Sequence, residues 1–166
     1  MRVLAFVASA AIATSAAAQT PAVIAALPLP ARAPFVEAQQ MCRELDGKLD
    51  VATEAAPYVR RADFNGDGDT DYLLSDAGLG CSTAASIYCR SAGCNNQVFL
   101  SVGTGYRKAW DGYAQELTID ETTKPARLKL ALHGSACGRT GADTCIRTLA
   151  WNGRTFAPVA APRRRR

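Results

Sequence analysis

Apolar and polar positions follow a helical spacing in the first part of the chain. Between Pro34 and Gly47 the apolar residues recur every three or four positions, at Phe35, Ala38, Met41, Cys42 and Leu45. This is the spacing of one face of a helix, and the face is expected to pack against a sheet. Proline suits the first turn and glycine the end of a helix, so we predict one substantial helix that begins at Pro34 and ends before Gly47.

After Gly47 the pattern becomes that of β structure, because short runs rich in β-branched and aromatic residues alternate with turn residues. The predicted strands are Lys48–Ala52, Tyr58–Ala62, Asp71–Ser75, Gln97–Val102, Arg107–Gly112, Arg127–Leu132, Thr144–Trp151 and Arg154–Val159. Asn152-Gly153 predicts a two-residue type I′ hairpin turn between the last two. The expected fold class is α+β, with one N-terminal helix packed on a mostly antiparallel β-sheet.

The ends of the chain differ in composition from its body. Residues 1–18 predict a secretory signal peptide, because Arg2 precedes a short apolar run that ends in small residues. Its removal leaves about 150 residues, enough for one domain with its own core. Residues 19–33 are rich in Ala and Pro and predict a flexible lead-in. The single domain is expected over 34–160, and 161–166 predict a disordered basic tail.

One short stretch concentrates acidic and amide side chains. Side chains that carry oxygen fall at positions 1, 3, 5 and 9 of a loop, as Asp63, Asn65, Asp67 and Asp71. Gly68 occupies position 6, where a tight calcium loop needs a sharp turn, and Asp69 at position 7 offers its backbone carbonyl. Calcium tolerates irregular cages of oxygen ligands, so this spacing favours a calcium site. The alternative is a polar hairpin turn without a metal.

The loop departs from an EF-hand because Leu74 stands where a bidentate Glu is needed and a strand-like run follows. Residues 62–75 resemble the calcium loop of FG-GAP/VCBS repeats, the integrin-type pattern D-F-N-G-D-G-x-x-D. The resemblance implies Ca²⁺ as the cofactor, held by the side chains of Asp63, Asn65, Asp67 and Asp71 and by the carbonyl of Asp69. It covers one copy only, so it implies a loop and not the β-propeller of that family.

The six cysteines predict a disulfide framework, because an even number in an exported chain favours pairing. They are Cys42, Cys81, Cys89, Cys94, Cys137 and Cys145. Pairing the last four locally, 89 with 94 and 137 with 145, leaves Cys42 with Cys81, although six cysteines permit 15 connectivities. The sequence contains no C-x-x-C pair, which argues against a thiolate zinc site or a thioredoxin-like site.

The charge pattern disfavours nucleic acid as a partner. The net charge of +4 comes from the final Arg163–Arg166, so the body is close to neutral and predicts no basic face.

No later stretch has the ~20 apolar residues of a transmembrane helix. The arginine tail predicts weak contact with anionic surfaces or, alternatively, no function. The predicted signal peptide and disulfide framework together indicate that the protein is exported, to the periplasm or beyond the cell.

Two further groups of residues are candidate sites. The single histidine, His133, precedes Gly134-Ser135, yet the G-x-S-x-G pattern of a nucleophile elbow is missing and no catalytic residue is assigned. Four aromatic residues favour either a ligand-binding face or the core of a small sheet: Tyr106, Trp110, Tyr113 and Trp151.

The leading hypothesis is an exported, disulfide-stabilised calcium-binding protein without enzymatic activity. A binding or inhibitory module for another protein or a glycan is the alternative, and a small calcium-dependent hydrolase a third.

Overall fold

The computed structural model describes residues 21–159 except 53, 55, 56 and 142. The predicted signal peptide and the basic tail lie outside the described residues. Two helices open this part of the chain, α1 (Ala22–Ala25) and α2 (Leu29–Arg43). The strands are β1 (Leu49–Val51), β2 (Val59–Ala62), β3 (Asp71–Ser75), β4 (Leu79–Cys81), β5 (Cys89–Arg90), β6 (Gly93–Val102), β7 (Gly105–Ala114), β8 (Glu116–Asp120), β9 (Arg127–Leu132), β10 (Cys145–Trp151) and β11 (Phe156–Pro158). Two short 3₁₀ turns, Asp76–Gly78 and Gly134–Cys137, complete the elements.

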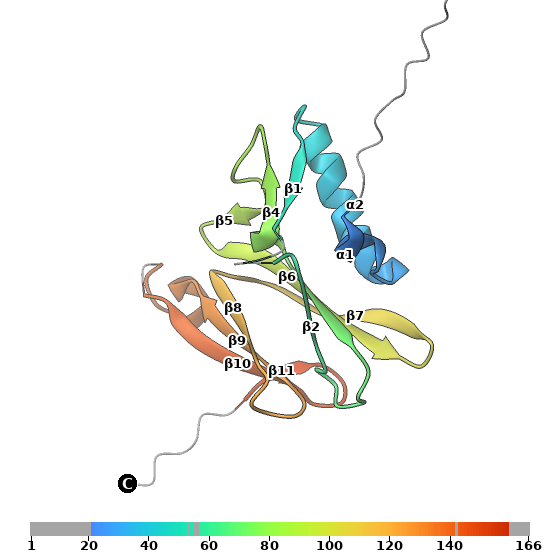
Figure 1. Cartoon of the computed structure of the whole chain (residues 1–166). Helices are drawn as coiled ribbons and strands as arrows, with labels where there is room; N and C mark the ends of the chain where they lie inside the picture. Colours follow the sequence, from blue (N-terminus) through green and yellow to red (C-terminus); the bar gives the residue numbers. More distant parts are fainter. Residues whose placement is uncertain (1–20, 53, 55–56, 142, 160–166) are drawn as a thin grey trace, which may run out of the picture.

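The strands form three antiparallel sheets, which confirms the α+β fold class. The central sheet has the order β2-β3-β6-β5, with β7 on the other side of β6. A second sheet has the order β11-β10-β9-β8, and β1 pairs with β4 as a separate ribbon. Figure 1 shows the helices above the central sheet and the second sheet below it. A single residue, Gln115, separates β7 from β8, so the chain passes directly from one sheet to the other.

The central sheet is buried on both faces. Successive residues of a strand point to opposite faces, and β3 shows this with two neighbouring leucines that are both fully buried. Leu73 belongs to the core between the two large sheets, together with Phe64 and Val98. Leu74 belongs to the core under the helices, together with Phe35. The central sheet therefore separates two hydrophobic cores.

The predicted lead-in over 19–33 is wrong for its described part. Residues 22–25 are helical, and α2 begins at Leu29, five residues earlier than predicted, with Pro30 in its first turn. Ile24 and Ala31 are fully buried in the core under the helices. Burial of these two side chains holds the helical residues of the predicted lead-in in place. Pro34, the predicted first residue of the helix, lies inside α2. α2 is the only long helix of the described residues, as predicted.

The strand predictions hold at β3 and β9, whose bounds are the predicted ones, and elsewhere they fall within a few residues. β4, β5 and β8 were not predicted. The last hairpin forms, but its turn is longer than two residues, because Trp151 pairs with Phe156. The Asn152 side-chain oxygen accepts the amides of Arg154 and Thr155, which stabilises this wider turn.

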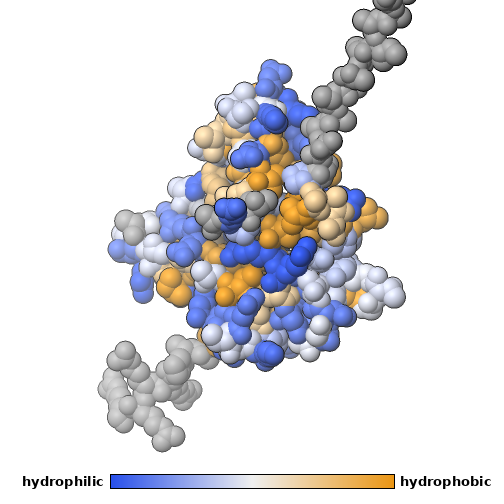
Figure 2. Space-filling view, viewed as in Figure 1, coloured by the Kyte–Doolittle hydropathy of each residue, from blue (hydrophilic) through white to orange (hydrophobic). Residues whose placement is uncertain are grey.

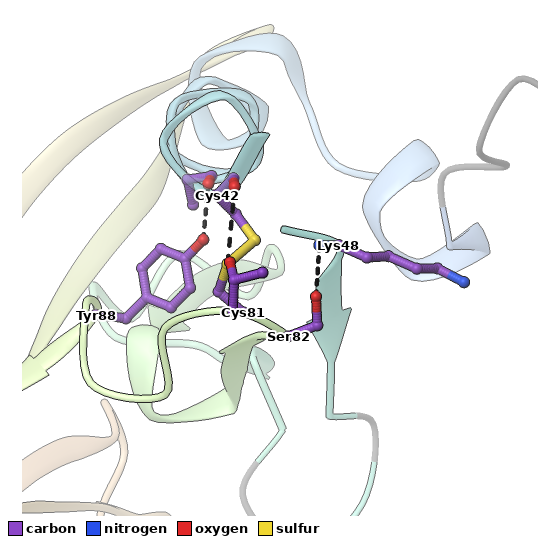
Figure 3. Close-up of a disulfide and its surroundings, with 7 residues drawn as sticks. Cys42, Lys48, Cys81, Ser82 and Tyr88 are labelled. Atoms are coloured by element: carbon purple, nitrogen blue, oxygen red, sulfur yellow. Dashed lines mark hydrogen bonds between the residues drawn. A yellow bond between two sulfur atoms is a disulfide. The ribbon is translucent and has the colours of Figure 1, made fainter. Parts of the chain in front are cut away.

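Three disulfides join Cys42 to Cys81, Cys89 to Cys94 and Cys137 to Cys145, which confirms the local pairing. The first ties α2 to β4, and Figure 3 shows it beside Tyr88, whose hydroxyl donates to the Ala38 carbonyl at 2.7 Å. Gly47 packs against this bridge, since a Cβ there would collide with the sulfurs of Cys42 and Cys81. A glycine is therefore required at this position by close packing, whereas the left-handed residue that follows the helix is Asp46, with a φ of 54°.

Candidate functional site

The acidic loop connects β2 to β3 and is held by hydrogen bonds from its own backbone. The Asp63 carboxylate accepts the amides of Gly66 at 2.6 Å and of Gly68 at 3.1 Å. The Asn65 oxygen accepts the amide of Asp67 at 3.0 Å, and Asp67 Oδ1 accepts that of Asp69 at 2.8 Å. Each of these bonds curls the chain around a side-chain oxygen, as in successive Asx turns.

Two glycines allow this curl. Gly66 and Gly68 have φ angles of 82° and 85°, a region that other residues rarely adopt. A Cβ at Gly68 would meet nothing within 4 Å, so the requirement there is conformational and not steric. This is the turn that the sequence predicted at position 6 of the loop.

Asp71 is the buried end of the loop. Its Oδ2 accepts the amide of Phe64 at 2.8 Å, and its Oδ1 accepts the amide of Ser101 at 2.8 Å. The side chain is fully buried, and burial raises the pKa of its carboxyl group. Asp71 therefore fastens the loop to β6, across 30 residues of sequence.

Ser101 joins the site from β6, and no pattern in the sequence predicts it. Its hydroxyl lies 2.8 Å from Asp67 Oδ2 and 3.0 Å from Asp71 Oδ1. A hydroxyl has one hydrogen, so it can donate to only one of these carboxylates at a time. The Ser101 oxygen and the oxygen of the other carboxylate then face each other without a proton between them. A cation or a further proton would relieve the repulsion between these two oxygens.

Hydrogen bonds to Asp67 hold its carboxyl in the charged form. The amide of Asp69, the Asn65 side chain and the Ser101 hydroxyl together lower the pKa of Asp67 below its usual range. Neither of the two ion pairs of the described residues, Lys108–Asp111 and Lys129–Asp120, reaches the loop. The loop thus holds four carboxyl groups without a basic partner in this part of the chain.

The structure brings four predicted ligand side chains onto one loop but not equally close together. Asn65 Nδ2 contacts Asp67 Oδ2 at 2.8 Å, and Asp67 shares Ser101 with Asp71. The Asp63 carboxylate turns to the glycine amides. Within the described ranges, no three His, Cys, Asp or Glu side chains are placed to hold a metal ion by themselves. A hard cation would need the Asn65 and Ser101 oxygens in addition, and these all-oxygen donors suit calcium.

The loop also contacts the rest of the molecule. The carbonyl of Asp63 accepts the amide of Ala126 at 2.8 Å, just before β9, and Gly66 faces the ring of Pro125. The Tyr106 hydroxyl donates to the Thr70 carbonyl at 2.9 Å. Ala126 directly precedes β9 of the second sheet, and Tyr106 belongs to β7 of the central sheet. The loop is therefore hydrogen-bonded to both large sheets.

His133 and Ser135 lie close together on an exposed turn. His133 Nδ1 lies 2.8 Å from the Ser135 hydroxyl. The other ring nitrogen faces Gly141, where a Cβ would collide with it. No carboxylate of the described residues hydrogen-bonds to this ring, so the pair lacks the third group that orients a catalytic histidine.

The four aromatic residues do not form one face. Trp110 and Trp151 pack against Phe156, with ring centroids 6.5 and 5.5 Å away, in the core between the sheets. Tyr106 packs against Tyr72 at 5.4 Å. Tyr113 is exposed. Core packing therefore accounts for the two tryptophans, as one of the two interpretations predicted.

Asp76 is an acid whose burial has a measurable consequence. It follows β3 on the helix side of the sheet, near the hydroxyls of Tyr58 and Tyr88, and burial raises its pKa to about 6. The folded protein therefore keeps a proton on Asp76 that the unfolded chain loses near its ordinary pKa. This group lowers stability progressively as the pH rises from about 4 to about 6.

We expect Asp76→Asn to stabilise the protein by about 1–2 kcal/mol at pH 7.5, a figure discounted because water reaches part of the carboxyl group. The gain should disappear below about pH 4, where both folded and unfolded forms of the native chain are protonated. Urea denaturation at several pH values measures it, with Asp50→Asn, at the exposed position of β1, as the control. A gain that is the same at every pH would contradict the assignment.

Exposed hydrophobic side chains gather around α2. Leu29, Val36, Met41 and Leu45 are each about half exposed or more. Figure 2 shows hydrophobic surface in the upper half of the molecule, where the helices lie in Figure 1. Met41 and Leu45 were predicted to lie on the packed face of the helix; only Phe35, Ala38 and Cys42 of that set are buried.

In the described part of the chain, no helix combines the length and the apolar character needed to cross a membrane. A scan against protein-family models and searches of curated proteins and of solved structures find no match for this chain.

Proposed function

We propose that this is an exported protein in which a single calcium ion, bound in the Asp63–Asp71 loop, stabilises a small disulfide-bonded domain. The observation that carries the proposal is the set of oxygens around Ser101, where two carboxylates share one hydroxyl hydrogen and have no basic partner in the described residues. Three disulfides support export, because such bonds persist outside the reducing cytosol. The proposal assigns the metal a structural role and gives no residue a catalytic one.

The residues that would hold the ion are those that the resemblance to FG-GAP/VCBS loops implies, with one addition. The Ser101 hydroxyl lies within hydrogen-bond distance of the carboxylates of Asp67 and Asp71. The Asn65 side chain contacts the Asp67 carboxylate and the Ser101 carbonyl. Asp63 would turn one oxygen from the glycine amides to the ion. When bound, calcium would neutralise the crowded carboxylates and join β3 and β6 through their side chains.

Thermal melts in chelator, in millimolar calcium and in millimolar magnesium test the proposal. At one hundred times the dissociation constant, calcium should add about 2.7 kcal/mol of stability. For a domain of this size that is a rise in Tm of roughly 10 °C. Magnesium should have a much smaller effect, since it demands octahedral geometry and gives up its waters reluctantly.

Variants of the loop provide the controls, each compared with its own melt in chelator. Asp67→Ala should abolish the calcium-dependent rise, because Asp67 contacts both Asn65 and Ser101. Asp69→Ala should keep most of it, because the backbone carbonyl survives the substitution. Superimposable melts of the native protein in chelator and calcium, with no heat in titration calorimetry, would show that the loop is an acidic turn.

A further inference from the structure

A cavity of about 310 Å³ opens between the edges of the two large sheets, away from the acidic loop. β2 is the edge strand of the central sheet and β8 that of the second sheet, and Figure 1 shows them near one another. Arg60 of β2 donates from Nη1 to the Leu117 carbonyl of β8 at 2.8 Å, so one hydrogen bond spans the opening. The cavity lies at the start of β2, whereas the acidic loop follows its end. Its size is that of the smaller ligand pockets in proteins.

Asn96 of β6 lines this cavity and has an unused hydrogen-bond acceptor. Its side chain is 2% exposed, and its amide nitrogen donates to the Cys94 carbonyl at 2.8 Å. That bond fixes the orientation of the amide group, because a carbonyl needs a donor opposite it. The Asn96 side-chain oxygen is buried without a hydrogen-bond partner in the described residues. A buried acceptor without a donor is costly, and a bound ligand would remove the cost.

Arg60 supplies a cation to the same cavity. Its Nε is buried without a hydrogen-bond partner, and neither ion pair of the described residues involves Arg60. Burial lowers the pKa of the guanidinium, as expected where a charge loses water without gaining a counter-ion. A guanidinium with free N–H groups is suited to a carboxylate.

Glu116 of β8 also lines the cavity and is exposed at its mouth. The lining thus carries a cation, a neutral acceptor and an anion. A simple anion would meet Arg60 favourably but would be repelled by Glu116, and it would leave the Asn96 oxygen without a donor. A molecule with a carboxylate and an ammonium group satisfies all three.

We propose that this cavity binds a free α-amino acid, with its carboxylate on Arg60 and its ammonium group on Asn96 and Glu116. The neighbouring Ser75 and Thr118 are available to its remaining polar atoms. The proposal is independent of calcium, since no residue of the acidic loop lines the cavity.

Titration of the full mature protein followed by ¹H–¹⁵N NMR tests the proposal. The probes are glycine, L-alanine and L-glutamine, each raised to about 10 mM, because a ligand with so few atoms is expected to bind weakly. At least one should shift the amide signals of Asn96 and Leu117 in a saturable way. N-acetyl-L-alanine, which lacks the ammonium group, and L-alaninamide, which lacks the carboxylate, should bind at least about tenfold more weakly than L-alanine.

Matched variants assign the contacts. Arg60→Met should weaken binding about tenfold or more, while Arg61→Met, on the opposite face of the same strand, should not. Glu116→Gln is on the surface and should weaken binding about two- to fivefold, with Glu121→Gln as its control. Glu116→Gln keeps the test valid if Arg60→Met fails to fold.

Three results would overturn the proposal. One is the absence of saturable shifts with every probe, and another is equal binding of the two blocked derivatives and L-alanine. The third is a set of shifts that centres on the acidic loop or on α2 instead of Asn96 and Leu117.

Discussion

Replacing Asp71 with alanine should destabilise the protein by about 3–5 kcal/mol even when calcium is absent. The substitution leaves the amides of Phe64 and Ser101 buried without an acceptor, and each such loss costs about 1–3 kcal/mol. The Ser101 hydroxyl loses one of its partners in addition. Urea denaturation in the presence of a chelator measures the effect without any contribution from a metal.

Two further variants show whether the lost hydrogen bonds are the cause. Asp71→Asn keeps the shape and one acceptor oxygen, so it should cost about half as much as Asp71→Ala. Asp69→Ala removes an exposed carboxylate from the same loop and should change stability by less than about 0.5 kcal/mol in chelator. If Asp71→Ala and Asp69→Ala were equally mild, the Asp71 carboxylate would not anchor the loop to β6.

Removing the disulfide between Cys42 and Cys81 should cost about 4 kcal/mol. The bridge closes a segment with a sequence separation of 39 residues, and the entropy that it removes from the unfolded chain grows with that length. Both sulfurs lie in the core under the helices, so the double variant Cys42→Ala/Cys81→Ala also loses buried contacts. Chemical denaturation of the variant and the native protein, both oxidised, measures the difference.

The bridge between Cys89 and Cys94 provides the comparison. Its sequence separation is 5 residues, and the same entropy relation gives only about 2 kcal/mol. The variant Cys89→Ala/Cys94→Ala should therefore be affected about half as strongly. Equal losses for the two double variants would mean that chain entropy does not set the contribution of these bridges.

The sequence predicted the strands whose alternation is regular and whose ends carry turn residues. Arg127–Leu132 alternates buried and less buried positions, as expected for a strand with one wet face, and its predicted bounds hold. β8 was missed although Leu117 and Ile119 also alternate, because its terminal acidic residues resemble those of a solvated turn. The start of α2 was missed because the Ala- and Pro-rich composition of residues 19–33 predicts a flexible segment, whereas Pro30 occupies the first turn of the helix.

The candidate site was predictable only where it is local. The spacing of Asp63, Asn65 and Asp67 indicated a tight loop, and their bonds to nearby amides agree with it. Ser101 was not predictable, because a strand serine has no distinguishing pattern and its contact to Asp71 depends on the register between β3 and β6. The cavity at Arg60 and Asn96 likewise forms only when two sheets meet.

The burial of the central sheet on both faces has a consequence for how the protein unfolds. Leu73 and Leu74 are joined by one peptide bond, yet each contributes to a different core. Separation of the helices from the sheet would bring water to β3 and β6, and these strands also form one wall of the other core. We therefore expect the two halves of the molecule to unfold as a single cooperative unit, with one melting transition for both cores.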